Sequence, residues 1–360
     1  MRIRPTQQKK CDSIRIPSRN RHLIASPALC CCAVKSALNS IGRQILPWSI
    51  SIGAMVYVFG YKIDWESIPE ATANANLPLF IAITVFDKLS FFVVWGLFQA
   101  AAIRQFIERV PIHKIMAVKG ASELVRTVNN SLADASFLVG VAQLVTTAGV
   151  ARVVAIASIP FITHFAVLLL QATFVLAFLE GGLAGNRDVT GLVIASWLLV
   201  IAVTIGVRNG YLHTMLEKVG IGGWIDSVKP RELLPYVGWF ALFGVYDVAI
   251  QGLAARSFGL DIDWVALIAR IPVMYFVLLI PSLGNFGTRE IAFATLYEEF
   301  GSRESLYAFA LWTNTIFLAM HVIIGVLFLN RAIALVREVR AAKQQGKPVP
   351  RPILRDAIDP

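Results

Sequence analysis

The sequence has few charged residues for its length, and this shortage argues against a soluble globular protein. Only 16% of its 360 residues are Asp, Glu, Lys or Arg, whereas 56% are hydrophobic. Such a balance is too apolar for an ordinary soluble domain, in which about a quarter of the residues carry charge. The composition therefore predicts a membrane protein.

Cysteine, histidine and nucleotide-binding motifs are equally sparse. The four cysteines are Cys11 and the consecutive Cys30, Cys31 and Cys32, and no pair has the spacing of a zinc ribbon or a redox motif. The chain has five histidines and no Gly-x4-Gly-Lys-Ser/Thr loop. These absences exclude a cysteine-based zinc site and an ATP-driven pump built on that loop. We expect no metal, no cofactor and no catalytic residue set.

Long apolar runs are what the sequence has in abundance. A membrane-spanning helix needs about 20 mostly apolar residues, and such runs recur along the chain. They lie at 37–59, 77–103, 133–150, 153–179, 189–207, 233–255, 264–283 and 306–329. The runs are continuous rather than alternating, which disfavours a transmembrane β-barrel. The predicted fold is all-α, a polytopic transmembrane bundle of about eight spans.

Basic residues concentrate at the two ends of the chain and account for much of its net charge of +10. The positive-inside rule then places both termini in the cytoplasm. We expect a disordered basic leader at 1–36, an integral membrane domain at 37–340 and a disordered basic tail at 341–360. Beside membrane spans these charges indicate topology and attraction to anionic lipid, so no nucleic-acid partner is expected.

The span count conflicts with one connecting segment. Eight full spans place residues 208–232 outside, although the basic residues of that segment favour the inside. Making 133–150 and 290–300 re-entrant removes the conflict. The prediction therefore includes one or two broken or re-entrant segments.

One stretch places helix breakers beside two charged residues within a region that is otherwise apolar enough to lie in a membrane. Residues 280–290 read Ile-Pro-Ser-Leu-Gly-Asn-Phe-Gly-Thr-Arg-Glu. The proline and glycines end one helix, and Thr288 is suited to cap the next. A broken backbone at bilayer depth is tolerated only where protein buries it or a wet cavity adjoins it. Free N–H groups at the new helix, together with Arg289, predict an anion site; the alternative is a capped loop with an exposed Arg289–Glu290 pair.

Asp87 and Lys88 are further candidates, because ionisable residues inside a span are costly and often functional. Neighbouring residues point about 100° apart on a helix, so the two do not pair with each other. At least one of them needs a partner on another helix or in a water-filled cavity. A structural bond between helices is the alternative to a functional role.

Asp247 and Arg270 complete the set of intramembrane candidates. Asp247 and Gln251 are one helical turn apart in the run 233–255 and share a face. Arg270 is permanently charged and needs an anion. Asp247, Glu290 and a lipid phosphate are the candidates for that anion.

Five positions of the 280–290 stretch fit a known pattern in register: Ser282, Gly284, Gly287, Arg289 and Glu290. The pattern is a proline and a serine, then closely spaced glycines, then Gly-x-Arg-Glu. It resembles the signature of the lysylphosphatidylglycerol synthase transmembrane-domain family. Asn285 departs from it where a glycine is usual, and Pro281 lies one residue closer to Ser282 than expected. The resemblance covers roughly 37–340.

The resemblance implies a lipid-handling role. In the synthases this membrane part is similar to a flippase that moves aminoacylated phospholipid between leaflets, and a separate C-terminal domain performs aminoacyl transfer. The residues after the last run are too few for such a domain, so translocation or lipid binding is expected without that transfer. The substrate is a phospholipid or a glycolipid or isoprenoid-linked lipid. The expected head-group residues are Ser282, Gly284, Gly287, Arg289, Glu290, Arg270, Asp247, Asp87 and Lys88.

Two other functions are weighed beside translocation. A membrane-embedded transferase acting on a lipid carrier needs an acid–base or metal set in a loop, and the loops are poor in histidine and paired carboxylates. A non-catalytic partner of a lipid or glycolipid biosynthetic enzyme is the third reading. The expected location is a bacterial inner membrane, with membrane lipid as the principal partner and a homo-oligomer left open.

Overall fold

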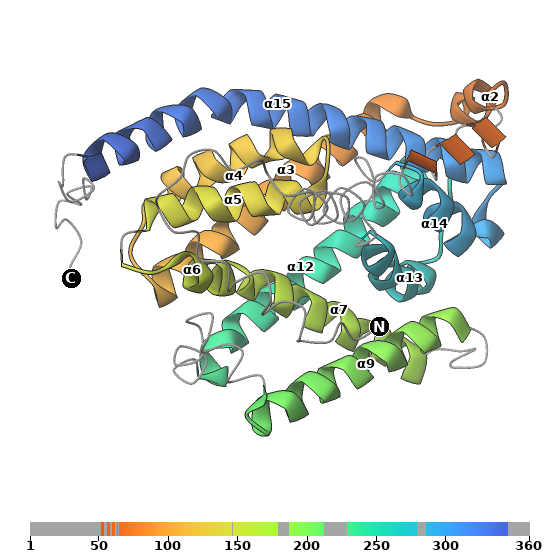
Figure 1. The fold of residues 1–360 in the computed structure, drawn as a ribbon. Coiled ribbons are helices and arrows are strands. Elements are labelled where there is room, and N and C mark those ends of the chain that lie inside the picture. Colours follow the sequence, from red (N-terminus) through yellow and green to blue (C-terminus); the bar gives the residue numbers. More distant parts are fainter. Residues whose placement is uncertain are drawn as a thin grey trace, which may run out of the picture. The chain divides into compact units, whose positions relative to one another are not determined.

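The computed structural model describes residues 52–53, 56–57, 60–61, 63, 65–145, 147–178, 187–211, 229–278 and 286–344. Regular structure within these residues is helical throughout, with no strand, as the sequence predicts. The elements, shown in Figure 1, are α2 (Ile68–Ala73), α3 (Leu77–Phe106), α4 (Ile112–Arg126), α5 (Asn130–Leu144), α6 (Val150–Ala157), α7 (Ile159–Phe178), α9 (Arg187–Arg208), α12 (Pro230–Ser257), α13 (Trp264–Val277), α14 (Thr288–Leu296), the 3-10 helix η4 (Glu298–Phe300) and α15 (Arg303–Gln344).

Four stretches of described helix are long and apolar enough to cross a membrane. They are Leu77–Phe106, Val150–Ala177, Arg231–Ser257 and Arg303–Val339. The second comprises α6 and nearly all of α7, which follow each other end to end. These helices support the predicted membrane class. The count of eight spans stays a prediction, and its first member, 37–59, lies mostly outside the described residues, as do the leader 1–36 and most of the tail.

Short helices occupy both places where broken segments were predicted. The run 133–150 largely coincides with α5, which has 15 residues, and 290–300 falls in α14 and η4, where α14 has 9. Neither helix reaches the roughly 20 residues that a crossing requires. Each packs against another short helix, α5 against α4 and α14 against α13. The membrane domain therefore combines long helices with pairs of short ones.

Polar side chains fix where several of these helices begin. The Asn76 side chain accepts the N–H of Leu79 ahead of α3, at 3.3 Å, and Asn129 accepts the N–H of Leu132 ahead of α5, at 3.0 Å. Asp263 accepts the N–H of Val265 ahead of α13, at 2.9 Å. Such caps satisfy backbone donors that a helix leaves free in its first turn. The sequence thus sets the starts of α3, α5 and α13 locally.

Glycines let α4 and α15 approach closely along their length (Figure 1). A Cβ atom added to Gly325 of α15 would lie 2.6–2.9 Å from Leu124, including its backbone nitrogen and Cα. A Cβ atom added to Gly120 of α4 would lie 2.3 Å from the Phe328 ring. Small residues at such contacts are typical of membrane helices, which associate mainly through van der Waals packing.

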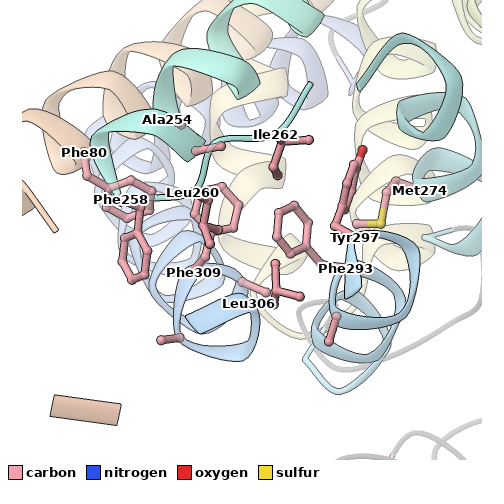
Figure 2. Close-up of a cluster of buried hydrophobic side chains, with 14 of the residues drawn as sticks. Phe80, Ala254, Phe258, Leu260, Ile262, Met274, Phe293, Tyr297, Leu306 and Phe309 are labelled. Carbon is pink, nitrogen blue, oxygen red and sulfur yellow. The ribbon is translucent and has the colours of Figure 1, made fainter. Parts of the chain in front are cut away.

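A hydrophobic core joins α14 to the longer helices around it (Figure 2). The ring of Phe293, from α14, stacks on Phe309 of α15 with 4.6 Å between centroids, and Phe80 of α3 meets Phe258 at 5.0 Å. Tyr297, at the end of α14, is 1% exposed. This packing holds the short helix in place and so positions the charged residues at its start.

Candidate functional site

A cavity of about 370 Å³ lies among α3, α4, α5, α7 and α12 to α15. Aromatic rings form much of its wall, among them those of Phe91, Trp95, Tyr275 and Phe317. Charged residues of both signs also line it: Asp87, Lys88, Lys119, Glu123, Arg126, Asp134, Asp247 and Arg289. Four predicted site residues, from three different helices, therefore share one cavity.

Arg289 follows a tight turn at the start of α14. Gly287 has φ of 84°, a left-handed conformation that glycine adopts readily. Gly287 is itself the N-cap of α14, so the prediction that Thr288 caps this helix is wrong. A residue in the left-handed region redirects the chain sharply, which lets the next turn of helix present Arg289 to the cavity.

The guanidinium of Arg289 packs against an aromatic ring and forms no direct ion pair with a described carboxylate, although the charges of Asp87 and Asp247 act on it from a distance. Its Cζ lies 4.9 Å from the centroid of Phe317, and its buried Nε has no hydrogen-bond partner there. A cation over a ring face is favourable, but it leaves the N–H donors of the guanidinium available to an anion. Arg289 thus lines the cavity from α14 without a direct bond to a described carboxylate.

Glu290 has a different environment from its neighbour. Its side chain is 0% exposed; one oxygen accepts the N–H of Gly287 at 2.7 Å, and the other accepts the Asn314 amide at 2.6 Å. The start of α14 is therefore partly occupied by the protein's own carboxylate. Glu290 does not line the cavity, so its observed contacts are those of a helix cap and an interhelix bond.

Asp87 and Asp247 face the cavity from α3 and α12. Asp87 is 8% exposed, and its Oδ1 is buried without a hydrogen-bond partner among the described residues. The Gln251 amide donates to Asp247 at 2.8 Å, as the one-turn spacing predicts, and Tyr275 lines the same cavity. The two aspartates give the cavity carboxylate oxygens that suit a hydroxyl or a cationic group.

Lys88 pairs with another helix, as predicted for one member of the Asp87–Lys88 dipeptide. Its Nζ lies 3.4 Å from Oε2 of Glu123 on α4, and it also lies 5.7 Å from the centroid of Phe317. Glu123 contacts His321 at 2.7 Å and Arg126 at 3.3 Å. Glu123 is thus the centre of a buried polar network that joins α3, α4 and α15.

Arg270 lies away from the cavity. It donates to the carbonyl of Leu296 and to the carboxylate of Glu299, and its Cζ is 5.5 Å from the Phe300 ring. The hydrogen bond from Arg270 holds the pKa of Glu299 below its ordinary value. The anion that Arg270 needs is therefore Glu299, which differs from the candidates taken from the sequence. This arrangement ties α13 to the end of α14.

Sequence reasoning missed Lys119 on the cavity's α4 wall, and the positions of two of its motif residues are untested. Ser282 and Gly284 lie outside the described residues. Lys119 and Glu123 fall in a segment, 104–132, that hydropathy treats as a connection between spans. The spacing of Lys119, Glu123 and Arg126 along one helical face is the signal that was available.

The lining of this cavity combines charged side chains with aromatic rings. Within the part of the chain that the structure describes, no cluster of three or more His, Cys, Asp or Glu is arranged to hold a metal ion. Charged groups surrounded by aromatic rings suit an amphipathic ligand with a polar end. Comparisons of the chain with protein-family models, curated proteins and solved structures give no match.

Proposed function

We propose that this chain is an integral membrane protein that binds a lipid by its head group and moves that head group across the bilayer. The observation that carries the proposal is Arg289, a cation that forms no direct ion pair with a described carboxylate and lies on the wall of a cavity lined in part by helices long and apolar enough to cross a membrane. A phosphate fits this position because a guanidinium binds phosphate oxygens with two parallel hydrogen bonds.

The remaining wall of the cavity suits the rest of such a lipid. Asp87 and Asp247 offer oxygens to hydroxyl or cationic parts of the head group, and Lys88 is available to a second oxygen if Glu123 releases it. The aromatic rings contact apolar parts near the head group. The acyl or isoprenyl tails stay in the surrounding lipid, so only the polar end is carried through the protein.

The direction of movement follows the lipid gradient or a coupled ion gradient, since the sequence has no Walker-type nucleotide loop. The proposed location is a bacterial inner membrane with both chain ends in the cytoplasm, on the basis of the terminal basic residues. Residues 287–290 belong to the motif that resembles a flippase-like family, and this resemblance also supports lipid translocation.

Leaflet exchange in reconstituted vesicles tests the proposal. Vesicles carrying a fluorescent anionic phospholipid are prepared with wild-type protein, with Arg289→Ala, with Arg289→Lys or without protein. We expect wild-type protein to speed exchange and Arg289→Ala to reduce it to the protein-free rate. Arg289→Lys restores little, because an ammonium group lacks the planar fork of donors.

A matched charge control separates this site from a general loss of basic charge. Arg109→Ala removes an exposed arginine that does not line the cavity, and it should exchange lipid at the wild-type rate. Circular dichroism and gel filtration confirm that each variant is folded. Wild-type exchange by folded Arg289→Ala protein would contradict the proposed role of Arg289, and formation of a new lipid product would favour a transferase instead.

A further inference from the structure

The cavity contains a second cation that the proposed function does not use. From its surroundings we infer that Lys119 binds a second anionic group of the lipid held at Arg289, so that the ligand carries two phosphate groups. The inference rests on the proposed function and narrows its substrate class to lipid diphosphates or lipids with two phosphodiesters. Lys119 and Arg289 come from α4 and α14 and line the same cavity.

Lys119 is buried without a carboxylate partner. The residue is 2% exposed, yet it lines the cavity, and it forms no ion pair or side-chain hydrogen bond with any described residue. Its Nζ lies 5.1 Å from the centroid of the Phe137 ring. This repeats the arrangement of Arg289 on Phe317: a cation rests on a ring and keeps its donors for another group.

Neighbouring carboxylates are already bound to other residues. Glu123, one turn after Lys119, contacts Lys88, Arg126 and His321. Asp134 accepts a hydrogen bond from Arg126 at 2.6 Å. Lys119 therefore lies beside an ion network that is complete without it.

Asp87 and Asp247 form no direct ion pair with Lys119 either, and their charges act on Arg289 from a distance. Asp247 is held by Gln251, and neither Asp247 nor Asp87 forms an ion pair with Lys119 or Arg289 in the described residues. An unneutralised charge away from water is costly. A ligand with one phosphate pairs directly with only one of Lys119 and Arg289, whereas a ligand with two phosphates pairs directly with both.

Binding of matched lipid pairs tests the inference. Purified full-length protein in detergent is titrated, by native mass spectrometry, with an isoprenyl diphosphate and the corresponding monophosphate. A second pair compares cardiolipin with phosphatidylglycerol. We expect wild-type protein to bind at least one two-phosphate lipid about tenfold more tightly than its partner. A preference in the isoprenyl pair indicates adjacent phosphates, and a preference in the cardiolipin pair indicates separate ones. Equal binding within both pairs would overturn the inference.

Lys119→Met is the decisive variant, because it keeps the length of the side chain and removes the charge. It should bind two-phosphate lipids no more tightly than one-phosphate lipids, while its affinity for the latter stays at the wild-type value. Lys114→Met, on the same helix but outside the cavity, should keep the preference. A preference that persists in Lys119→Met would overturn the inference and leave the role of Arg289 standing.

Two further measurements guard against a folding artefact and a soluble ligand. Lys119→Arg retains positive charge and should retain the preference, whereas a merely structural lysine would show no such rescue. Lys119→Met should unfold at or above the wild-type temperature, because it removes a buried unpaired charge. Inorganic diphosphate is added as a competitor, and displacement of the lipid at equal concentration would overturn the assignment to a lipid ligand.

Discussion

Asn314 of α15 donates a hydrogen bond to Glu290 of α14, with 2.6 Å between Nδ2 and Oε1. The other oxygen of Glu290 accepts the backbone N–H of Gly287. One buried carboxylate thus closes the first turn of α14 and fastens it to α15. Because Arg289 lies between the two anchored positions, this bond also sets where the guanidinium enters the cavity.

Replacing Glu290 should destabilise the protein and misplace Arg289. Glu290→Ala removes one acceptor from the Asn314 amide and leaves the buried Gly287 N–H without this acceptor, which costs about 1–3 kcal/mol for that N–H. Thermal unfolding in detergent measures the loss. Glu298→Ala, at an exposed glutamate in η4, is the control and should unfold at nearly the wild-type temperature. Equal unfolding temperatures for the two variants would show that the bond contributes nothing.

A side chain at Gly287 should be tolerated poorly, even one as small as a methyl group. Its φ of 84° costs an L-residue roughly 1–2 kcal/mol. Gly287→Ala should therefore lower the unfolding temperature and weaken lipid exchange together. Gly287→Asn should behave like Gly287→Ala, because a φ of 84° with a ψ of −50° lies outside the left-handed helical region that asparagine tolerates. Identical behaviour of both variants and wild type would refute the strain argument.

The contact between Gly325 and Leu124 predicts opposite effects for two glycine replacements. Gly325→Ala forces a Cβ against the backbone of α4, and overpacking of this kind costs about 1–3 kcal/mol. Gly238→Ala in α12 meets no atom within 4 Å and should stabilise its helix by up to roughly 1 kcal/mol. Unfolding temperatures of the two variants should therefore move apart, and a shift of both in one direction would contradict the close approach.

The Lys88–Glu123 pair gives an ordering of three variants. Removing one partner of a buried ion pair costs about 3–5 kcal/mol, so Lys88→Met and Glu123→Gln should each destabilise the protein. Glu123→Gln should be the worse, since Glu123 also holds Arg126 and His321. The double variant should lose less than the two single losses added together. A double-mutant cycle measures this coupling, and strict additivity would mean that the pair is not energetically linked.

The sequence predicts the helices and the breaks between them better than it predicts which side chains bond across helices. Long apolar runs mark α3, α12 and α15 because a membrane helix must satisfy its own backbone and present apolar side chains to lipid. The Asp247–Gln251 bond follows from helical spacing alone. The short helices α5 and α14 fall in the two segments that were made re-entrant to reconcile the span count with the basic residues of 208–232.

Partners across the fold are where sequence reasoning fails. Arg270 binds Glu299 and not a carboxylate within a predicted span, because η4 folds back beside α13 in a way that no local pattern specifies. The network around Glu123 joins residues far apart in the chain. Hydropathy alone does not distinguish the α4 segment from other connections between spans. Lys119 reached the candidate site only through the cavity that these contacts surround.

The interlock of α4 with α15 has a mechanical consequence. Leu124 and Gly325 touch at the backbone, so these two helices must travel as one rigid half, accompanied by α5. On the opposite side α7, α12 and α13 pack against one another. Among the described elements, those that touch both halves include α6 and also α3 and α14, which bear Asp87 and Arg289. Any rocking of one half against the other would therefore alter the spacing of those charges and, with it, the binding of the proposed head group.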